Sequence, residues 1–341
     1  MVRYPAPLAP GDLIGVTSPS SGVSPALWPR LDVAVQVLRD AGYEVVVGEC
    51  MGAEGVTSAP APQRAAELSA MLLDPAIRAV VPPWGGELAI DLLGLLDFDA
   101  LGAAEPTWLV GYSDLTTVML PLTLRTGIAT LHGSNLMDTP YDAVSPMLHW
   151  LVAATARAGS ELRQGAGAMH LTGPHPRFEA DPEVRSLPVN TPTRWKVLGE
   201  RAEARANGRL IGGCLEIVSM LPGTAHGDLA GFAAAHAPEG LLVYVEVAEI
   251  DAYNADRMLH HLRLAGWFDA ANAVLVGRSG GPASGSFTHV DAVEHALGDL
   301  PVPVFYDLDI GHVPPQLALV NGAVATIEVT PDSAALTQQL V

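Results

Sequence analysis

The sequence predicts an α/β protein with two domains: an N-terminal, mostly parallel, Rossmann-like sheet domain and a smaller C-terminal α/β domain. Strand-like apolar runs alternate with helical patterns over residues 12–133, which favours a parallel sheet covered on both faces. A second block with the same alternation begins at residue 208. Residues 158–208 are rich in Gly, Pro and charged residues and lack periodicity. We therefore expect domains over 1–157 and 209–341, joined by residues 158–208.

The first block contains three successive strand–helix–strand patterns. The run "DLIGV" is typical of a strand, and the apolar spacing after it predicts a helix that ends near Gly42, before the strand "YEVVVG". Residues 64–86 repeat the helix and the strand, and residues 107–133 contain strand, helix and strand. Pro121 lies within that last helix and is expected to kink it or end it early. Ligands bind at the carboxyl ends of parallel strands, so residues there are the first site candidates.

The second block begins with "GRLIGGCLEIVSMLPGT" and continues with "LLVYV", an apolar run typical of a fully buried strand. A helix is predicted over residues 254–265, ending at Gly266. The chain closes with strands around the loop "DLDIGH". A structureless connection as long as residues 158–208 would be unusual, so we expect it to be a functional loop or to contain small strands.

The composition disfavours several classes of function. The 341-residue chain has a formal net charge of −19, which is unsuited to nucleic acid or to an anionic membrane surface. The start of the sequence lacks the pattern of a signal peptide, and no apolar run is long enough for a spanning helix. The two cysteines, Cys50 and Cys214, suit a reducing compartment. We therefore expect a cytoplasmic protein that acts on a small molecule.

Three residues at predicted strand ends form a candidate catalytic set. Ser113 follows the run "WLVGY", Glu246 ends the run "LLVYVE", and His312 follows Gly311. A serine becomes a nucleophile when a histidine takes its proton, and a carboxylate can orient that histidine. Each residue also has a simpler interpretation: a helix N-cap for Ser113, a salt bridge to Arg257 for Glu246, and an ordinary loop histidine for His312.

The chain resembles the LD-carboxypeptidase family of serine peptidases, and segment 158–208 makes it most similar to the branch of the microcin C self-immunity peptidases. The motifs "GYSDLT", "TGIATLHG", "GRLIGGCLEIVSMLPGT", "VYVEVAEIDAYNADRMLHHLRLAGWF" and "DLDIGH" occur in the family order and span most of the chain. The resemblance implies that Ser113 is the nucleophile, that Glu246 rather than Glu249 is the triad acid, and that His312 is the base. It also implies an active site in the cleft between the two domains.

The resemblance further suggests where the oxyanion and the substrate bind. The backbone N–H groups of Gly86 and Asp114 are the expected oxyanion donors, because one belongs to a double glycine and the other follows the nucleophile at a helix N-terminus. The alternative for Gly86 is a simple tight turn. Trp84, Glu87 and Trp195 are candidate substrate contacts, although tryptophan is more commonly used in packing.

Trp195 bears on the choice of substrate. It stands among polar, turn-forming residues in segment 158–208, so it could stack on a purine or anchor the segment against the second domain. His132, His260 and His261 lack metal-ligand spacing with other His or Cys residues, so neither a metal nor another cofactor is expected.

The leading hypothesis is hydrolysis of a microcin C-like aminoacyl-nucleotide through an acyl-enzyme. The alternative substrate is a cytoplasmic murein tetrapeptide, from which the terminal D-Ala would be removed. A different class of function is an inactive ligand-binding protein on the same scaffold. The resemblance also implies a homodimer, the commonest symmetric assembly.

Overall fold

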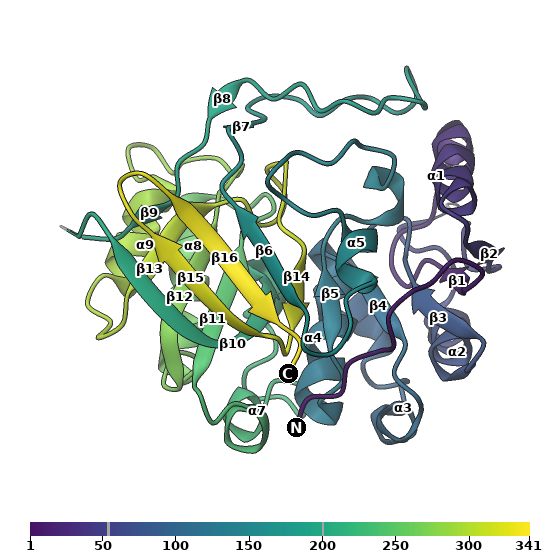
Figure 1. The fold of residues 1–341 in the computed structure, drawn as a ribbon, viewed down its shortest axis with the longest axis horizontal. Helices are drawn as coiled ribbons and strands as arrows, with labels where there is room; N and C mark the ends of the chain where they lie inside the picture. The colour runs from purple at the N-terminus through teal and green to yellow at the C-terminus, as the bar shows by residue number, and fades with distance from the viewer. Residues whose placement is uncertain (53–54, 200) are drawn as a thin grey trace.

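The computed structural model describes residues 1–52, 55–199 and 201–341 (Figure 1). In these ranges the chain forms two large sheets with flanking helices and a small two-stranded ribbon. The predicted α/β class and the largely parallel first sheet are confirmed. The helices within these ranges are all too short or too polar to span a bilayer.

The first sheet has the strand order β14-β5-β4-β3-β1-β2. The strands from the N-terminal half pair in parallel, whereas β14 comes from near the C-terminus and runs antiparallel to β5. Strand β4 is buried along its whole length, as expected of a parallel strand covered on both faces. The strands are β1 (Leu13–Val16), β2 (Glu44–Val47), β3 (Ile77–Val80), β4 (Trp108–Gly111), β5 (Thr130–His132) and β14 (Leu319–Asn321).

The helices of this unit are α1 (Trp28–Asp40), α2 (Ala61–Leu73), α3 (Phe98–Ala103), α4 (Thr116–Thr126) and α5 (Trp150–Ala154). Short 3₁₀ turns cover Pro25–Leu27, Ala89–Leu92, Ser113–Leu115 and Leu136–Asp138. Helix α4 does not end early at Pro121: it continues to Thr126, and Gly127 closes it in a left-handed conformation. Proline removes one helical hydrogen bond, and burial of α4 on every side from Thr116 to Leu124 compensates for that loss.

The second sheet has the order β6-β16-β15-β10-β11-β12-β13-β9, with a parallel centre of β10 to β13 and antiparallel strands at both edges. Strand β11 ends in Glu246 and is buried throughout. The strands are β6 (Glu161–Gly165), β9 (Lys196–Val197), β10 (Ala204–Cys214), β11 (Leu241–Glu246), β12 (Ala271–Gly277), β13 (Val304–Leu308), β15 (Val324–Val329) and β16 (Ala334–Gln339). The helices are α6 (Leu215–Val218), α7 (Leu229–His236), α8 (Ala252–Leu264) and α9 (His289–Leu297).

Segment 158–208 contains short strands. It adds β6 and β9 to opposite edges of the second sheet, so this sheet has more strands than the first. The ribbon of β7 (Met169–His170) and β8 (Thr191–Pro192) belongs to the same segment, which runs across the top of the molecule towards α1 in Figure 1. Strand β10 begins at Ala204, before the expected start of the C-terminal domain.

The two units pack tightly against each other through one hydrophobic core, and a second buried cluster belongs to the other face of the second sheet. Buried apolar residues of both sheets belong to one continuous cluster. At the boundary the backbone N–H of Cys214 donates to Oγ1 of Thr116 at 3.2 Å, and the backbone N–H of Gly212 in β10 donates to Oδ1 of Asn321 in β14 at 3.1 Å. Across the same boundary, the loop that follows β13 lies within hydrogen-bond distance of the turn that follows β4 and of the end of β11.

Candidate active site

Ser113 lies on a strained turn between β4 and α4. Its φ of 65° falls in the left-handed region, which is unfavourable for a residue with a Cβ atom. Gly85 packs directly against this turn: a Cβ atom there would lie 2.9 Å from both the backbone N of Asp114 and the Cβ of Ser113. The local backbone therefore fixes the direction of the Ser113 side chain before any partner contacts it.

His312 connects Ser113 to Glu246. Its Nε2 lies 3.0 Å from Oγ of Ser113, and its Nδ1 lies 2.7 Å from Oε2 of Glu246. Gly311 makes the second contact possible, because it has a φ of 87° and a Cβ atom there would overlap the Glu246 carboxylate. With the proton on Nδ1 donated to Glu246, Nε2 is free to accept the Ser113 hydroxyl proton.

Burial and charge act on this pair in opposite directions. Burial alone lowers the pKa of His312, but the charge and hydrogen bond of Glu246, with Glu216 and Asp138, raise it above the usual 6.5. Burial raises the pKa of Glu246, and the facing His312 more than offsets this, so the Glu246 pKa is lowered. Glu246 has no exposed surface. The pair therefore favours a histidine cation next to an ionised carboxylate.

Asp114 ties together the loops around Ser113. Its buried carboxylate accepts hydrogen bonds from the Ser20 hydroxyl, the backbone N–H of Ala89 at 2.8 Å and the Thr117 hydroxyl at 3.2 Å. The backbone N–H of Asp114 lies in the first turn of a helix, where an N–H has no acceptor within the helix. Gly86 follows Gly85 in the adjacent loop and has a φ of 142°. Both predicted oxyanion donors thus lie on loops that meet at Ser113.

Trp84 and Glu87 lie on the same loop. Trp84 is half-buried, and its indole N–H faces the carbonyl oxygens of Ser21 and Gly22, each at 3.2 Å. Glu87 is largely exposed, but partial desolvation of its carboxyl, followed by the charges of Glu249, Asp114 and Glu216, raises its pKa. Trp84 therefore braces a loop, whereas Glu87 contributes negative charge to the surroundings of the site.

Trp195 does not face Ser113. It is 2% exposed, packs in the core of the second sheet with Phe305 and Ile327, and donates its indole N–H to Oδ2 of Asp309 at 2.8 Å. A tryptophan enclosed in this way has no free face for a purine. The structure supports the interpretation of Trp195 as an anchor. A stacking role of Trp195 was a reason to prefer a nucleotide substrate, and that reason no longer applies.

Two hollows open beside His312. One is lined by Tyr112, Asp138 and Tyr141, and burial raises the pKa of Asp138 to about 6. The other is lined by Arg194, Lys196 and Arg278, and also by Asp307, which pairs with Lys196 at 2.7 Å. Segment 158–208 contributes to both hollows, through His170, Leu171, Thr172, Gly173, His175, Leu187, Pro192, Arg194 and Lys196. The segment thus covers the region around His312 although Trp195 is turned away.

The sequence analysis missed two carboxylates that support the site. Asp309 is fully buried and binds Trp195 and Arg278, the latter at 3.0 Å. Glu216 accepts the backbone N–H groups of Ala248 and Glu249 at 2.9 and 3.1 Å, and so holds the loop that follows Glu246. Asp309 is part of the motif "DLDIGH", so an acidic residue three positions before His312 was the available signal.

These features define a class: a two-sheet α/β protein with Ser, His and Glu in one hydrogen-bonded line, as in serine hydrolases. Comparison with known proteins identifies the family within this class. Residues 14–133 match the LD-carboxypeptidase N-terminal domain, and residues 207–327 match the LD-carboxypeptidase C-terminal domain. The chain belongs to the LD-carboxypeptidase family and is a serine-type carboxypeptidase or amidase.

Relatives with different names match over nearly the full length. A Streptomyces coelicolor protein that bears a provisional carboxypeptidase name is 30% identical, with 95% of this chain and 93% of the relative covered. The microcin C7 self-immunity protein of Escherichia coli is 24% identical, with 98% and 95% covered. A Bacillus subtilis protein with the provisional name murein peptide carboxypeptidase is 25% identical, with 97% and 93% covered.

Solved structures agree on the fold. The microcin C7 self-immunity protein in complex with aspartyl sulfamoyl adenosine is similar with a TM-score of 0.81 at 22% identity, and 99% of this chain and 98% of that chain are covered. A related protein from Bacillus anthracis has a TM-score of 0.79 at 21% identity, with 98% and 99% covered. At such identities the likeness establishes the fold alone.

Proposed function

We propose that the protein hydrolyses an amide bond through an acyl-enzyme formed on Ser113. His312 Nε2 takes the Ser113 proton as Oγ attacks the carbonyl carbon, and then gives that proton to the leaving amine. A water molecule, deprotonated by the same nitrogen, releases the acyl group. Glu246 holds the Nδ1–H tautomer and stabilises the imidazolium. The observation that supports these roles best is the unbroken line of contacts at 3.0 and 2.7 Å.

The backbone N–H groups of Gly86 and Asp114 are proposed to bind the oxyanion. Donors aimed at the developing negative charge are worth about 10²–10³ in rate for a single hydrogen bond. The Asp114 carboxylate supports this arrangement because it bonds the neighbouring loop at Ala89. Every proton in these steps moves between groups of this chain, water and substrate, so the proposal includes no cofactor.

The substrate is proposed to be a small peptide with a free carboxylate. Arg278 is 8% exposed and lines the second hollow beside His312. Its Nη2 is paired with Asp309 at 3.0 Å, whereas its Nη1 has no hydrogen-bond partner among the described residues. A buried guanidinium N–H without an acceptor is unfavourable, and a carboxylate satisfies it well. Lys196 and Arg194 line the same hollow. This supports removal of the terminal residue from a murein L,D-tetrapeptide.

A second candidate is an aminoacyl-nucleotide of the microcin C kind. Segment 158–208 supports it, because a long cover over the hollows can enclose a substrate larger than a dipeptide end, and a phosphate also suits Arg278. The curated relatives include proteins named for each activity. The substrate is therefore tested with both compounds side by side.

The test measures release of D-Ala from murein tetrapeptide and of the amino acid from a processed microcin C analogue, by mass spectrometry. The peptide proposal expects faster release from the tetrapeptide, and the reverse order would favour the nucleotide. Ser113→Ala is the control for adventitious hydrolysis. If neither compound is cleaved and a serine-directed probe leaves Ser113 unlabelled, the inactive binding protein becomes the better interpretation.

We also propose that the protein is a homodimer, as the family resemblance implies. Light scattering across micromolar concentrations is expected to give twice the chain mass of 35.6 kDa. A monomer throughout that range would contradict the proposal.

A further inference from the structure

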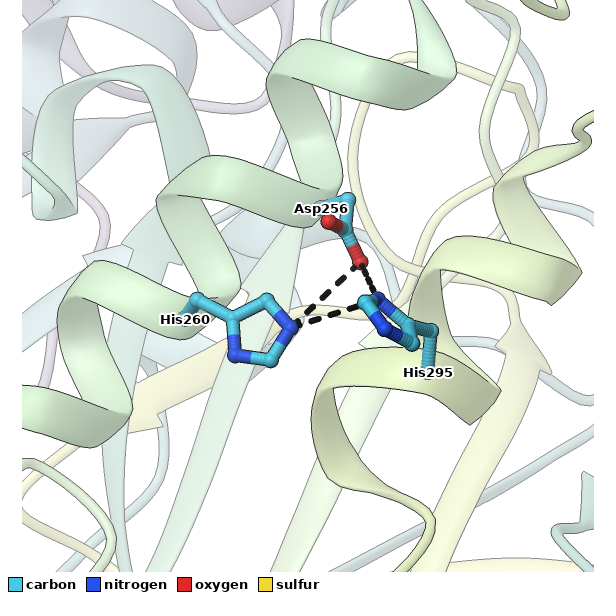
Figure 2. A group of neighbouring side chains, drawn as sticks. All are labelled: Asp256, His260 and His295. Atoms are coloured by element: carbon cyan, nitrogen blue, oxygen red, sulfur yellow. Dashed lines mark hydrogen bonds and ion pairs between the residues drawn. The ribbon is translucent and has the colours of Figure 1, made fainter.

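Helices α8 and α9 hold a second group of chemically active side chains. Asp256 and His260 lie one turn apart on α8, and His295 on the adjacent α9 points into the space between them (Figure 2). None of the three lines the hollows beside His312. The spacing along α8 is four residues, and His295 is 35 positions further along the chain, so the group is visible only in the folded protein.

The three ligand atoms are separated as a metal site requires. His260 Nε2 lies 3.3 Å from His295 Nδ1, Asp256 Oδ1 lies 2.8 Å from His295 Nδ1, and Asp256 Oδ1 lies 3.7 Å from His260 Nε2. Ligands about 2.0–2.1 Å from a tetrahedral Zn²⁺ are about 3.3 Å apart. The mean of the three observed distances is also about 3.3 Å, so one ion could contact all three atoms.

Hydrogen bonds alone satisfy this arrangement poorly. When His295 Nδ1 carries a proton, it donates that proton to Asp256. His260 Nε2, which faces the same Nδ1, is then left without a proton donor of its own. When His260 Nε2 carries the proton instead and donates to His295, a lone pair of Nδ1 faces the Asp256 carboxylate. The Asp256 side chain is 16% exposed, and the ion-pair partners that the described residues offer it are these two histidines. A cation at the centre would satisfy all three atoms together.

We propose that Asp256, His260 and His295 bind a divalent transition-metal ion of the Zn²⁺ type. Two imidazoles and one carboxylate suit Zn²⁺ better than the hard cations Mg²⁺ and Ca²⁺. The His295 side chain is 64% exposed, which leaves a fourth position open to water. Phe287 packs edge-on against the His295 ring and restrains its orientation. The bound ion ties α8, which follows the Glu246 strand, to α9, which precedes the His312 strand.

The test uses the full-length protein without a histidine tag, freed of metal by a chelator and titrated with Zn²⁺ in a calorimeter. One equivalent is expected to bind, and saturating Zn²⁺ is expected to raise Tm by several degrees, because an ion that binds the folded state stabilises it. His260→Ala and His295→Ala should each weaken binding at least about tenfold. The matched control is His261→Ala, which alters the exposed neighbouring histidine and should bind as the parent does.

Substitution with Co²⁺ provides an independent readout of the ligands. A tetrahedral site with two histidines is expected to give visible absorption bands that are lost in His295→Ala and kept in His261→Ala. Because His295 is largely exposed, its substitution should leave the fold intact, which circular dichroism can verify. Absence of Zn²⁺ binding to the parent protein would overturn the proposal, and so would equal binding by the His260→Ala/His295→Ala double variant.

Discussion

The two sheets contribute to the candidate site by different physical means. On the N-terminal side, Ser113 is positioned by its backbone: a left-handed φ of 65°, a closely packed Gly85 and the bonds of Asp114 define the turn. On the C-terminal side, His312 and Glu246 are positioned by charge and burial, with the carboxylate fully enclosed. The nucleophile therefore depends on covalent geometry, whereas the base depends on electrostatics.

This difference indicates what each half tolerates. A strained turn keeps its shape when the serine hydroxyl is removed, because the strain belongs to the backbone. A buried ion pair behaves otherwise, since the loss of one partner leaves the other without compensation in a low-dielectric environment. Substitutions on the first side that keep a Cβ atom should affect chemistry alone, and substitutions on the second should also affect protonation and stability.

The largest effect is expected for Ser113→Ala, which removes the nucleophile and keeps the turn. It should lower kcat by roughly 10³–10⁶, as in other serine triads, and leave the free energy of unfolding nearly unchanged. Steady-state kinetics and a urea titration on the same preparation measure both quantities. Substantial residual activity would mean that Ser113 is not the nucleophile.

Glu246→Gln tests the other side of the comparison. Glutamine keeps the shape of the side chain but can favour the wrong tautomer of His312, so kcat should fall by roughly 10²–10⁴. Glu249→Gln is the matched control, because Glu249 is the exposed second glutamate of the same E-x-x-E motif. Similar losses in both variants would show that general negative charge, and not the contact with His312, is what matters.

The pH dependence of activity tests the electrostatic interaction between His312 and Glu246. Because Glu246 keeps the pKa of His312 above 6.5, kcat/KM should decrease as the pH falls through a midpoint above that value, where His312 becomes protonated. In Glu246→Gln the negative charge is gone, so the midpoint should move to lower pH. Profiles of the two proteins over pH 5–9 make the comparison. An unchanged midpoint would assign the titration to another group.

The sequence was sufficient to predict features that depend on a local repeat or that lie at the end of a strand. Alternating patterns predicted the parallel sheet, and strand ends drew attention to Ser113, Glu246 and His312, which the structure brings together. The family resemblance assigned these three residues to one site, but long-range pairings without such a resemblance were not predictable. Trp195 stands among polar neighbours in the sequence, and its burial follows from Asp309, 114 residues away. The same applies to β14, which joins a sheet formed otherwise by the N-terminal half.

Trp195→Phe tests whether this tryptophan is an anchor. It deletes the indole N–H donated to the buried Asp309 carboxylate and should destabilise the protein by about 1–3 kcal/mol. Both candidate substrates should lose kcat/KM to the same modest extent, because Trp195 lies in the core. A loss confined to the nucleotide substrate would restore the stacking role. Denaturation and parallel assays of the two substrates provide the measurement.

The smallest expected effect isolates the strain in the turn itself. Glycine adopts the left-handed region readily, whereas alanine at a φ of 65° bears the same strain as Ser113. Both substitutions abolish the hydroxyl, so their difference reports the backbone alone. Ser113→Gly should be more stable than Ser113→Ala by about 1 kcal/mol, even though glycine gains more entropy on unfolding.

Ser24 provides the matched control for this pair. Its φ is −65° and its side chain makes no capping hydrogen bond, so alanine fits there without strain. At Ser24 the order should reverse, with the Ala variant as stable as the Gly variant or more so, because the entropy of the unfolded chain then dominates. Chemical denaturation of the Ala and Gly variants at Ser113 and at Ser24 measures the four free energies of unfolding. The same order at both positions would mean that the turn at Ser113 is not strained, and that the nucleophile, like the base, is held by its side-chain contacts.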